Sequence, residues 1–193
     1  MIAILVLAAG ASSRMRGGDK LREQIDGESL LSLMCKRALA ADLGPVLVTL
    51  PSADHPRRAD LAELQVQPIF VADASEGMAA SIRAGVAALP PGLSGVMILP
   101  ADMPDLTTQD LRTLAHVTPQ GRIGRGASGT KPGHPVLFPA ALFPDLQKIS
   151  GDQGARPVIA AHHARLDLVP LPDRHALTDL DTPEAWADWR ALR

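Results

Sequence analysis

Short apolar segments alternate with segments of helical periodicity along most of the chain. Residues 2–7 form a continuous apolar run rich in branched side chains, as is typical of a strand buried on both faces. In the segment 29–43, apolar residues such as Leu30, Met34 and Ala38 fall on one face of a helix. Strands that alternate with helices in this way predict right-handed crossovers and a mostly parallel sheet.

The same pattern gives bounds for each expected element. Strands are predicted at 2–7, 46–50, 69–72, 96–99, 136–138 and 167–171. Helices are predicted at 29–43, 57–64, 78–89, 107–117, 140–147, 154–162 and 183–192. We therefore expect an α/β protein, a Rossmann-like three-layer sandwich with a mostly parallel mixed sheet, in which residues 1–193 form a single domain.

Composition and charge narrow the class of protein. The chain has 193 residues, of which 46% are hydrophobic, enough for one domain with a substantial core. A net charge of −2 and a pI near 6.3 argue against a nucleic-acid partner. No apolar run approaches the ~20 residues of a membrane span, and no segment resembles a signal peptide. With Cys35 as its single cysteine, expected to be a buried structural thiol, the chain is expected to be cytoplasmic.

Three loops are expected to meet at one edge of the sheet. Ligands of such sheets bind beyond the carboxyl ends of the strands. The loop 8–20, the segment before Met78 and the loop 100–106 all fall on that edge. We expect them to form one site, although they lie far apart in the sequence.

The first of these loops has the chemistry of a phosphate site. The sequence LVLAAGASSRMRGGDK, residues 5–20, lacks both the Walker pattern and the dinucleotide pattern G-x-G-x-x-G. Its small residues let backbone N–H groups approach an anion, and its hydroxyls and cations are Ser12, Ser13, Arg14, Arg16 and Lys20. A mobile loop with solvated charges is the alternative, but this pattern favours a polyphosphate ligand.

The loop also resembles the opening motif of the MobA-like nucleotidyltransferases, L-A-[AG]-G-x-S-x-R-M-G-x-x-K. The matching residues are Leu7, Ala8, Ala9, Gly10, Ser12, Arg14, Met15 and Lys20, whereas Arg16 stands where the motif has Gly. Blocks resembling the family follow in order: EGMAASIRAG (76–85), ADMP (101–104), GHPVLF (133–138), SGDQGAR (150–156) and DLDTPEAW (179–186). LAAG together with the GHP and GDxGAR blocks most resembles the cytidylyltransferases of the molybdenum cofactor.

Candidate metal ligands follow the fourth strand and precede the last helix. A magnesium ion bound with a nucleotide needs only one or two protein carboxylates. Asp102 suits this role, although an aspartate in a turn also bonds its own backbone. Asp179 and Asp181 precede Thr182, which reads as a helix N-cap. The resemblance implies Mg²⁺ at Asp102 and Asp181, with Asp181 preferred over Asp179.

The resemblance also assigns the remaining site residues. It implies that the nucleotide is bound by Leu7, Ala8, Ala9, Gly10, Ser13, Arg14, Lys20, Gly77 and Ser81. It implies catalytic roles for Arg14, Lys20 and Asp102, and second-substrate contacts for His134, Asp152 and Arg156. Each of these segments also has a purely structural interpretation from the residues alone. The 77–81 segment is equally a glycine turn with a solvated serine, His134 is a turn residue bonded to backbone, and Asp152 is an ordinary helix cap.

Taken together, the resemblance implies transfer of CMP from CTP to the phosphate of molybdopterin, with release of pyrophosphate. The expected partners are an NTP, a phosphorylated pterin and a recipient molybdoenzyme. Three alternatives stay open: another NTP or phosphorylated acceptor, an NAD(P)-dependent oxidoreductase on the same scaffold, and a non-catalytic protein that delivers the cofactor.

Overall fold

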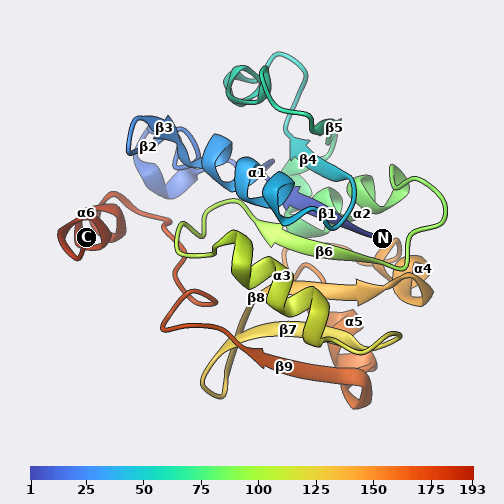
Figure 1. Ribbon diagram of the computed structural model, residues 1–193. Helices are drawn as coiled ribbons and strands as arrows, with labels where there is room; N and C mark the ends of the chain where they lie inside the picture. Colours follow the sequence, from blue (N-terminus) through green and yellow to red (C-terminus); the bar gives the residue numbers. More distant parts are fainter.

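One seven-stranded sheet forms the centre of the computed structural model, which describes all residues 1–193 (Figure 1). Its strands are β1 Ile2–Leu7, β4 Val46–Leu50, β5 Gln67–Phe70, β6 Gly95–Pro100, β7 Ile123–Ser128, β8 Lys131–Pro139 and β9 Leu166–Pro170. They lie in the order β5-β4-β1-β6-β8-β7-β9. β8 pairs antiparallel with both β6 and β7, and every other pair in this sheet is parallel. The mostly parallel mixed sheet is confirmed.

Helices connect most of these strands. They are α1 Leu30–Ala41, α2 Met78–Ala87, α3 Thr108–Val117, α4 Phe143–Leu146, α5 Arg156–Ala161 and α6 Pro183–Ala191, and a small hairpin pairs β2 Gln24–Ile25 with β3 Glu28–Ser29. Their starts follow the capping rules: Ser29 caps α1, Thr107 and Asp110 form a capping box at α3, and Thr182 caps α6. None of the helices is both long enough and apolar enough to cross a membrane.

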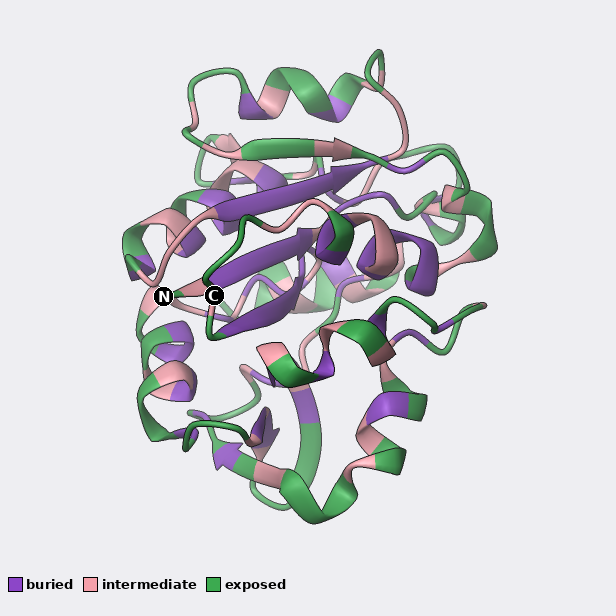
Figure 2. Cartoon of the chain, turned by 90° about the vertical axis from the view of Figure 1, so that its right-hand side faces the viewer, coloured by how far each residue is buried: buried purple, intermediate pink, exposed green.

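Helices cover both faces of the sheet, so the three-layer arrangement is confirmed. One core cluster of 29 buried residues packs α1, α3 and Trp186 of α6 against one face. A second cluster of 15 buried residues packs α2, α4 and α5 against the other face. Figure 2 shows the central strands buried between these layers. Cys35 is fully buried in the first cluster, and burial raises the pKa of its thiol to about 12, as a structural thiol requires.

The sequence prediction missed β7 and mistook several bounds. β7 has the sequence IGRGAS, in which two glycines interrupt the apolar run. Close packing requires them: a Cβ on Gly124 would lie 1.9 Å from Thr118 Oγ1, and one on Gly126 would lie 2.4 Å from the His134 carbonyl oxygen. β8 begins earlier than the predicted 136–138 because the glycine and prolines before that run also join the sheet.

The elements at the sheet edges also differ from prediction. The predicted helix 57–64 is a 3-10 helix, Pro56–Leu61, whose Arg57 side chain is drawn into the interior. The predicted strand 69–72 starts earlier, at Gln67, because edge strand β5 tolerates Pro68. The predicted helix 140–147 divides into the 3-10 helix Ala140–Leu142 and α4, and α5 is shorter than the predicted 154–162.

Candidate active site

The site lies where the strand order reverses. The chain runs from β1 to β4 and β5 on one side, and then returns to place β6 on the other side of β1. The carboxyl ends of β1 and β6 therefore flank a crevice, which is where open α/β sheets bind their ligands. A cavity of about 310 Å³ opens there. The residues lining it are Leu7, Ala9, Gly10, Ala11, Lys20, Leu21, Ala74, Gly77, Met78, Ser81, Pro100, Asp102 and Asp152.

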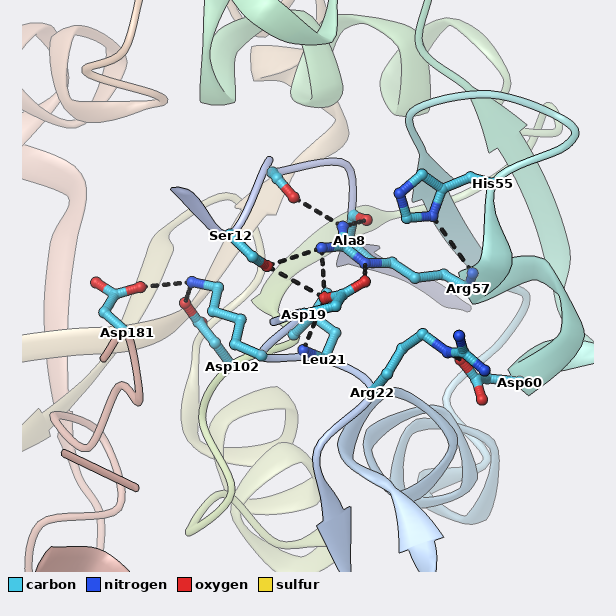
Figure 3. A network of polar contacts seen from close by, with 12 residues as sticks. Ala8, Ser12, Asp19, Leu21, Arg22, His55, Arg57, Asp60, Asp102 and Asp181 are labelled. Atoms are coloured by element: carbon cyan, nitrogen blue, oxygen red, sulfur yellow. Dashed lines mark hydrogen bonds and ion pairs between the residues drawn. The ribbon is translucent and has the colours of Figure 1, made fainter. Parts of the chain in front are cut away.

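Lys20 and Asp102 line this cavity, and Lys20 joins Asp102 to Asp181. Its ammonium donates to Asp102 Oδ2 and, at 2.5 Å, to Asp181 Oδ1. The backbone brings the two aspartates together, because the Leu180 amide donates to the Asp102 carbonyl over 3.0 Å. Figure 3 shows an oxygen of Asp102 and an oxygen of Asp181 joined to the same nitrogen atom, which is Lys20 Nζ. Arg14 reaches the same group, with Nη2 lying 2.7 Å from Asp181 Oδ2.

The pKa of Lys20 identifies it as a cation. Burial alone would lower this pKa, but the charges and hydrogen bonds of Asp102 and Asp181 outweigh burial and raise it above its usual value. Asp179 makes no ion pair, and burial together with repulsion from Asp102 and Asp181 raises its pKa. The structure therefore separates Asp181, which belongs to the charged group, from Asp179, which stands beside it.

The paired aspartates fit the donor set of a divalent cation bound with a nucleotide. Oxygens of Asp102 and Asp181 converge on one positive charge, here the Lys20 ammonium. No cluster of three or more His, Cys, Asp or Glu side chains arranged for a metal occurs in the chain. Two protein carboxylates, with phosphates and water completing the shell, are the usual arrangement for Mg²⁺.

A buried arginine, which the sequence analysis missed, fixes the loop 8–20 through hydrogen bonds to its backbone. Arg57 is 1% exposed and donates to the carbonyls of Ala8 and Gly10 at 2.6 and 2.8 Å. It also donates to the Ser12 hydroxyl at 2.9 Å and forks onto both carboxylate oxygens of Asp19 at 2.7 and 2.8 Å (Figure 3). The charge and hydrogen bonds of Arg57 lower the pKa of Asp19 against the opposing effect of burial. No local pattern around Arg57 reveals this role.

A second, smaller hollow of about 120 Å³ adjoins the first. Met78 and Asp152 line both. The loop before α5 lies directly against the start of α2: the Ala79 amide donates to Gly151 O over 3.2 Å, and a Cβ on Gly77 would lie 2.9 Å from Asp152 Cα. The predicted second-substrate residues His134, Asp152 and Arg156 all line this hollow. Arg125 of β7 joins them and was not predicted, because β7 itself was not.

The structure brings most of the predicted nucleotide residues together. Those lining the first cavity are Leu7, Ala9, Gly10, Lys20, Gly77 and Ser81, whereas Arg14 is exposed and lines neither hollow. Ala8 lies behind the loop, where its amide donates to Thr49 Oγ1 at 3.1 Å. Ser13 is exposed and lines neither hollow, so the structure gives it no contact with the site. Arg16, the departure from the motif, pairs with Glu184 of α6 at 2.5 Å.

A cationic loop and converging carboxylates at the switch point of a mostly parallel sheet are typical of a nucleotide-binding α/β domain. The chain belongs to the MobA-like NTP transferase domain family, whose profile matches residues 4–166, and it is a nucleotidyltransferase of that family. Purine catabolism protein PucB of Bacillus subtilis (strain 168) is 32% identical over 189 residues, covering 93% of this chain and 91% of that protein. Molybdenum cofactor guanylyltransferase of Rhodopseudomonas palustris (strain HaA2) is 33% identical over 153 residues, covering 75% of this chain and 68% of that protein.

Solved structures share the whole fold. Rv0371c from Mycobacterium tuberculosis H37Rv superposes with a TM-score of 0.84 and 28% identity, over 99% of this chain and 96% of that chain. Its complex with manganese superposes with a TM-score of 0.82 and 24% identity, over 97% of this chain and 96% of that chain.

Proposed function

We propose that this protein transfers CMP from CTP to the phosphate of molybdopterin, or of its molybdenum form, and releases pyrophosphate. One observation supports this most strongly: Lys20, which lines the switch-point cavity with Asp102, lies between Asp102 and Asp181, and Arg14 pairs with Asp181. That grouping supplies cations for a triphosphate and carboxylates for a metal at one place.

In the proposed reaction, a phosphate oxygen of the acceptor attacks the α-phosphorus of CTP. A new P–O bond forms there, the bond from the α-phosphorus to the bridging oxygen breaks, and pyrophosphate leaves with that electron pair. Arg14 holds the β- and γ-phosphates, and Lys20 stabilises charge that builds on the α-phosphoryl and leaving oxygens. The acceptor phosphate is already ionised at neutral pH, so the reaction needs no general base.

Asp102 and Asp181 are the residues that would hold Mg²⁺ in this site. When bound, the ion neutralises phosphate charge and orients the reacting groups. The manganese complex of the related fold supports a divalent cation in proteins of this architecture.

The choice of CTP rests on the LAAG form of the loop and its resemblance to the cytidylyltransferases. Molybdopterin as acceptor is supported by the molybdenum cofactor guanylyltransferase among the relatives. A molybdoenzyme is the proposed recipient of the finished cofactor.

A pyrophosphate-release assay tests the proposal. The purified protein is given each of the four NTPs with Mg²⁺, in the presence and absence of molybdopterin. We expect release with CTP, only when molybdopterin is present, and none after chelation of the metal.

Asp102→Asn tests the role of this carboxylate, because the substitution keeps the shape of the side chain and removes its charge. Its release rate should fall by about a hundredfold or more. Equal release from GTP would withdraw the cytidylyl assignment. Absence of release with every NTP would favour the cofactor-delivery alternative.

A further inference from the structure

Two arginines face the second hollow without any carboxylate paired to either. Arg125 comes from β7 and Arg156 from the first turn of α5, and both line the 120 Å³ hollow beside the nucleotide cavity. Neither takes part in an ion pair, although most other arginines of the chain do. Asp152 is the only carboxylate in the lining.

One hydrogen bond holds the Arg125 guanidinium in position and leaves its two terminal nitrogens free to bind a ligand. Its Nε donates to the Gly133 carbonyl over 2.9 Å, and its two terminal nitrogens have no partner within the chain. Both guanidinium side chains line the same hollow, and burial together with the positive charge of Arg156 lowers the pKa of Arg125. Like charges in a partly buried site are unfavourable unless an anion lies between them.

The rest of the hollow fits a compact anionic ligand. Seven of the twelve residues that line it are hydrophobic and form its apolar wall, among them Ile82, Ile98, Val136 and Phe138. The Nδ1 atom of His134 is buried there and has no hydrogen-bond partner. The hollow is much smaller than the nucleotide cavity, so it suits a phosphate group with its adjoining atoms and not a second nucleotide.

We propose that Arg125 and Arg156 together bind the phosphate monoester dianion of the acceptor, with Arg125 as the residue that selects it. Planar guanidinium groups fork onto phosphate oxygens, and two of them match a dianion. The apolar wall receives the part of the acceptor next to its phosphate. The inference rests on the proposed function, because it supplies the site of the second substrate for that reaction.

Binding of phenyl phosphate, followed by ³¹P NMR line broadening, tests the inference without any turnover. Phenyl phosphate offers a dianion on a small apolar body. Arg125→Gln and Arg156→Gln should each weaken its binding at least about tenfold, the loss expected for one charged hydrogen-bonding partner. Arg165→Gln, at an exposed arginine that lines neither hollow, is the matched control and should change binding less than twofold.

Two further arms identify the site and the ligand class. Lys20→Ala should leave phenyl phosphate binding unchanged, whereas a loss confined to that variant would place the ligand in the nucleotide cavity and overturn the inference. Benzoate should bind at least about tenfold more weakly than phenyl phosphate, and equal binding would overturn the preference for a dianion. Unchanged binding in both Arg125→Gln and Arg156→Gln would also overturn the proposal; thermal melting of each variant shows that it is folded.

The two proposals fail separately. Loss of pyrophosphate release with every NTP contradicts the transfer reaction and leaves the phenyl phosphate result untouched. Unchanged phenyl phosphate binding in the arginine variants contradicts the anion site, even if CTP turnover is normal.

Discussion

Lys20 keeps two carboxylates together that would otherwise repel each other. With Arg14 also paired to Asp181, two positive and two negative side chains balance beside the cavity that Lys20 and Asp102 line. In the proposed reaction, a nucleoside triphosphate would bring excess negative charge to this group, and a divalent cation would restore the balance. Lys20 and Arg14 would then exchange their carboxylate partners for phosphate partners.

Lys20 and Arg14 should therefore differ in their kinetic effects. Lys20→Ala should lower kcat by about a hundredfold with a smaller rise in KM for CTP, because charge on the α-phosphoryl group grows in the transition state. Arg14→Ala should mainly raise KM, because the β- and γ-phosphates are charged in both states. Steady-state kinetics on both variants measure the split. A Lys20→Ala enzyme with normal kcat and raised KM would contradict a transition-state role for Lys20. It would mean that the loop only binds phosphate.

The sequence predicts the site residues that belong to a recognisable motif. It does not predict residues that reach the site only because the fold brings distant segments together. Lys20, Asp102 and Asp181 stand in recognisable blocks, and the structure places them in contact. Arg57 lies 49 positions from Ala8 and 38 from Asp19, so no local spacing signals its contacts. Arg125 lies on β7, a strand that the sequence did not predict because glycines interrupt its apolar run. Residues of both kinds line one of the two hollows or support the loop beside them.

At the scale of elements, the loop after β1 takes its shape from the 3-10 helix Pro56–Leu61. That helix follows β4, the neighbour of β1, and it presents Arg57 beneath the loop. The alternation of strands and helices predicts that the two segments lie on the same sheet edge, but it does not predict a buried charge between them. Burial of a charge is favourable only with complete pairing, which depends on side-chain geometry.

Removing this guanidinium should destabilise the fold strongly. Arg57→Met leaves the Asp19 carboxylate and two backbone carbonyls without their partner, and we expect a loss of roughly 3–5 kcal/mol in the free energy of unfolding. Arg58→Met is the control, because Arg58 is the exposed neighbour of Arg57 and makes a single hydrogen bond, to a backbone carbonyl. This substitution should lower the free energy of unfolding by less than about 1 kcal/mol. Urea unfolding of both variants measures the difference. Equal, small losses would show that the loop does not depend on Arg57.

At the scale of the whole molecule, α2 divides the two hollows. Its first residue, Met78, lines both, and the loop 150–154 closes over its start. The predicted nucleotide residues come from the parallel half of the sheet, whereas Arg125 and His134 come from the part built on antiparallel β8. The central strands β1, β4 and β6 were predicted to within one residue because their apolar runs are continuous. In the other half, β7 was missed and β8 was predicted too short because glycine and proline interrupt these strands.

The buried His134 should make stability depend on pH. Burial, followed by the charge of Arg125, lowers its pKa to about 4 from the usual 6.5. Between these values the unfolded chain binds a proton that the folded chain excludes, so stability is full above pH 6.5 and falls as pH drops toward 4. His134→Gln should remove roughly 2–3 kcal/mol of the loss that the wild-type protein shows between pH 7 and 4.5, measured by urea unfolding. Because carboxylates also titrate there, the comparison is between variants, with His116→Gln at an exposed site expected to follow the wild type. A His134→Gln curve parallel to the wild-type curve would mean that this imidazole titrates as it does in water.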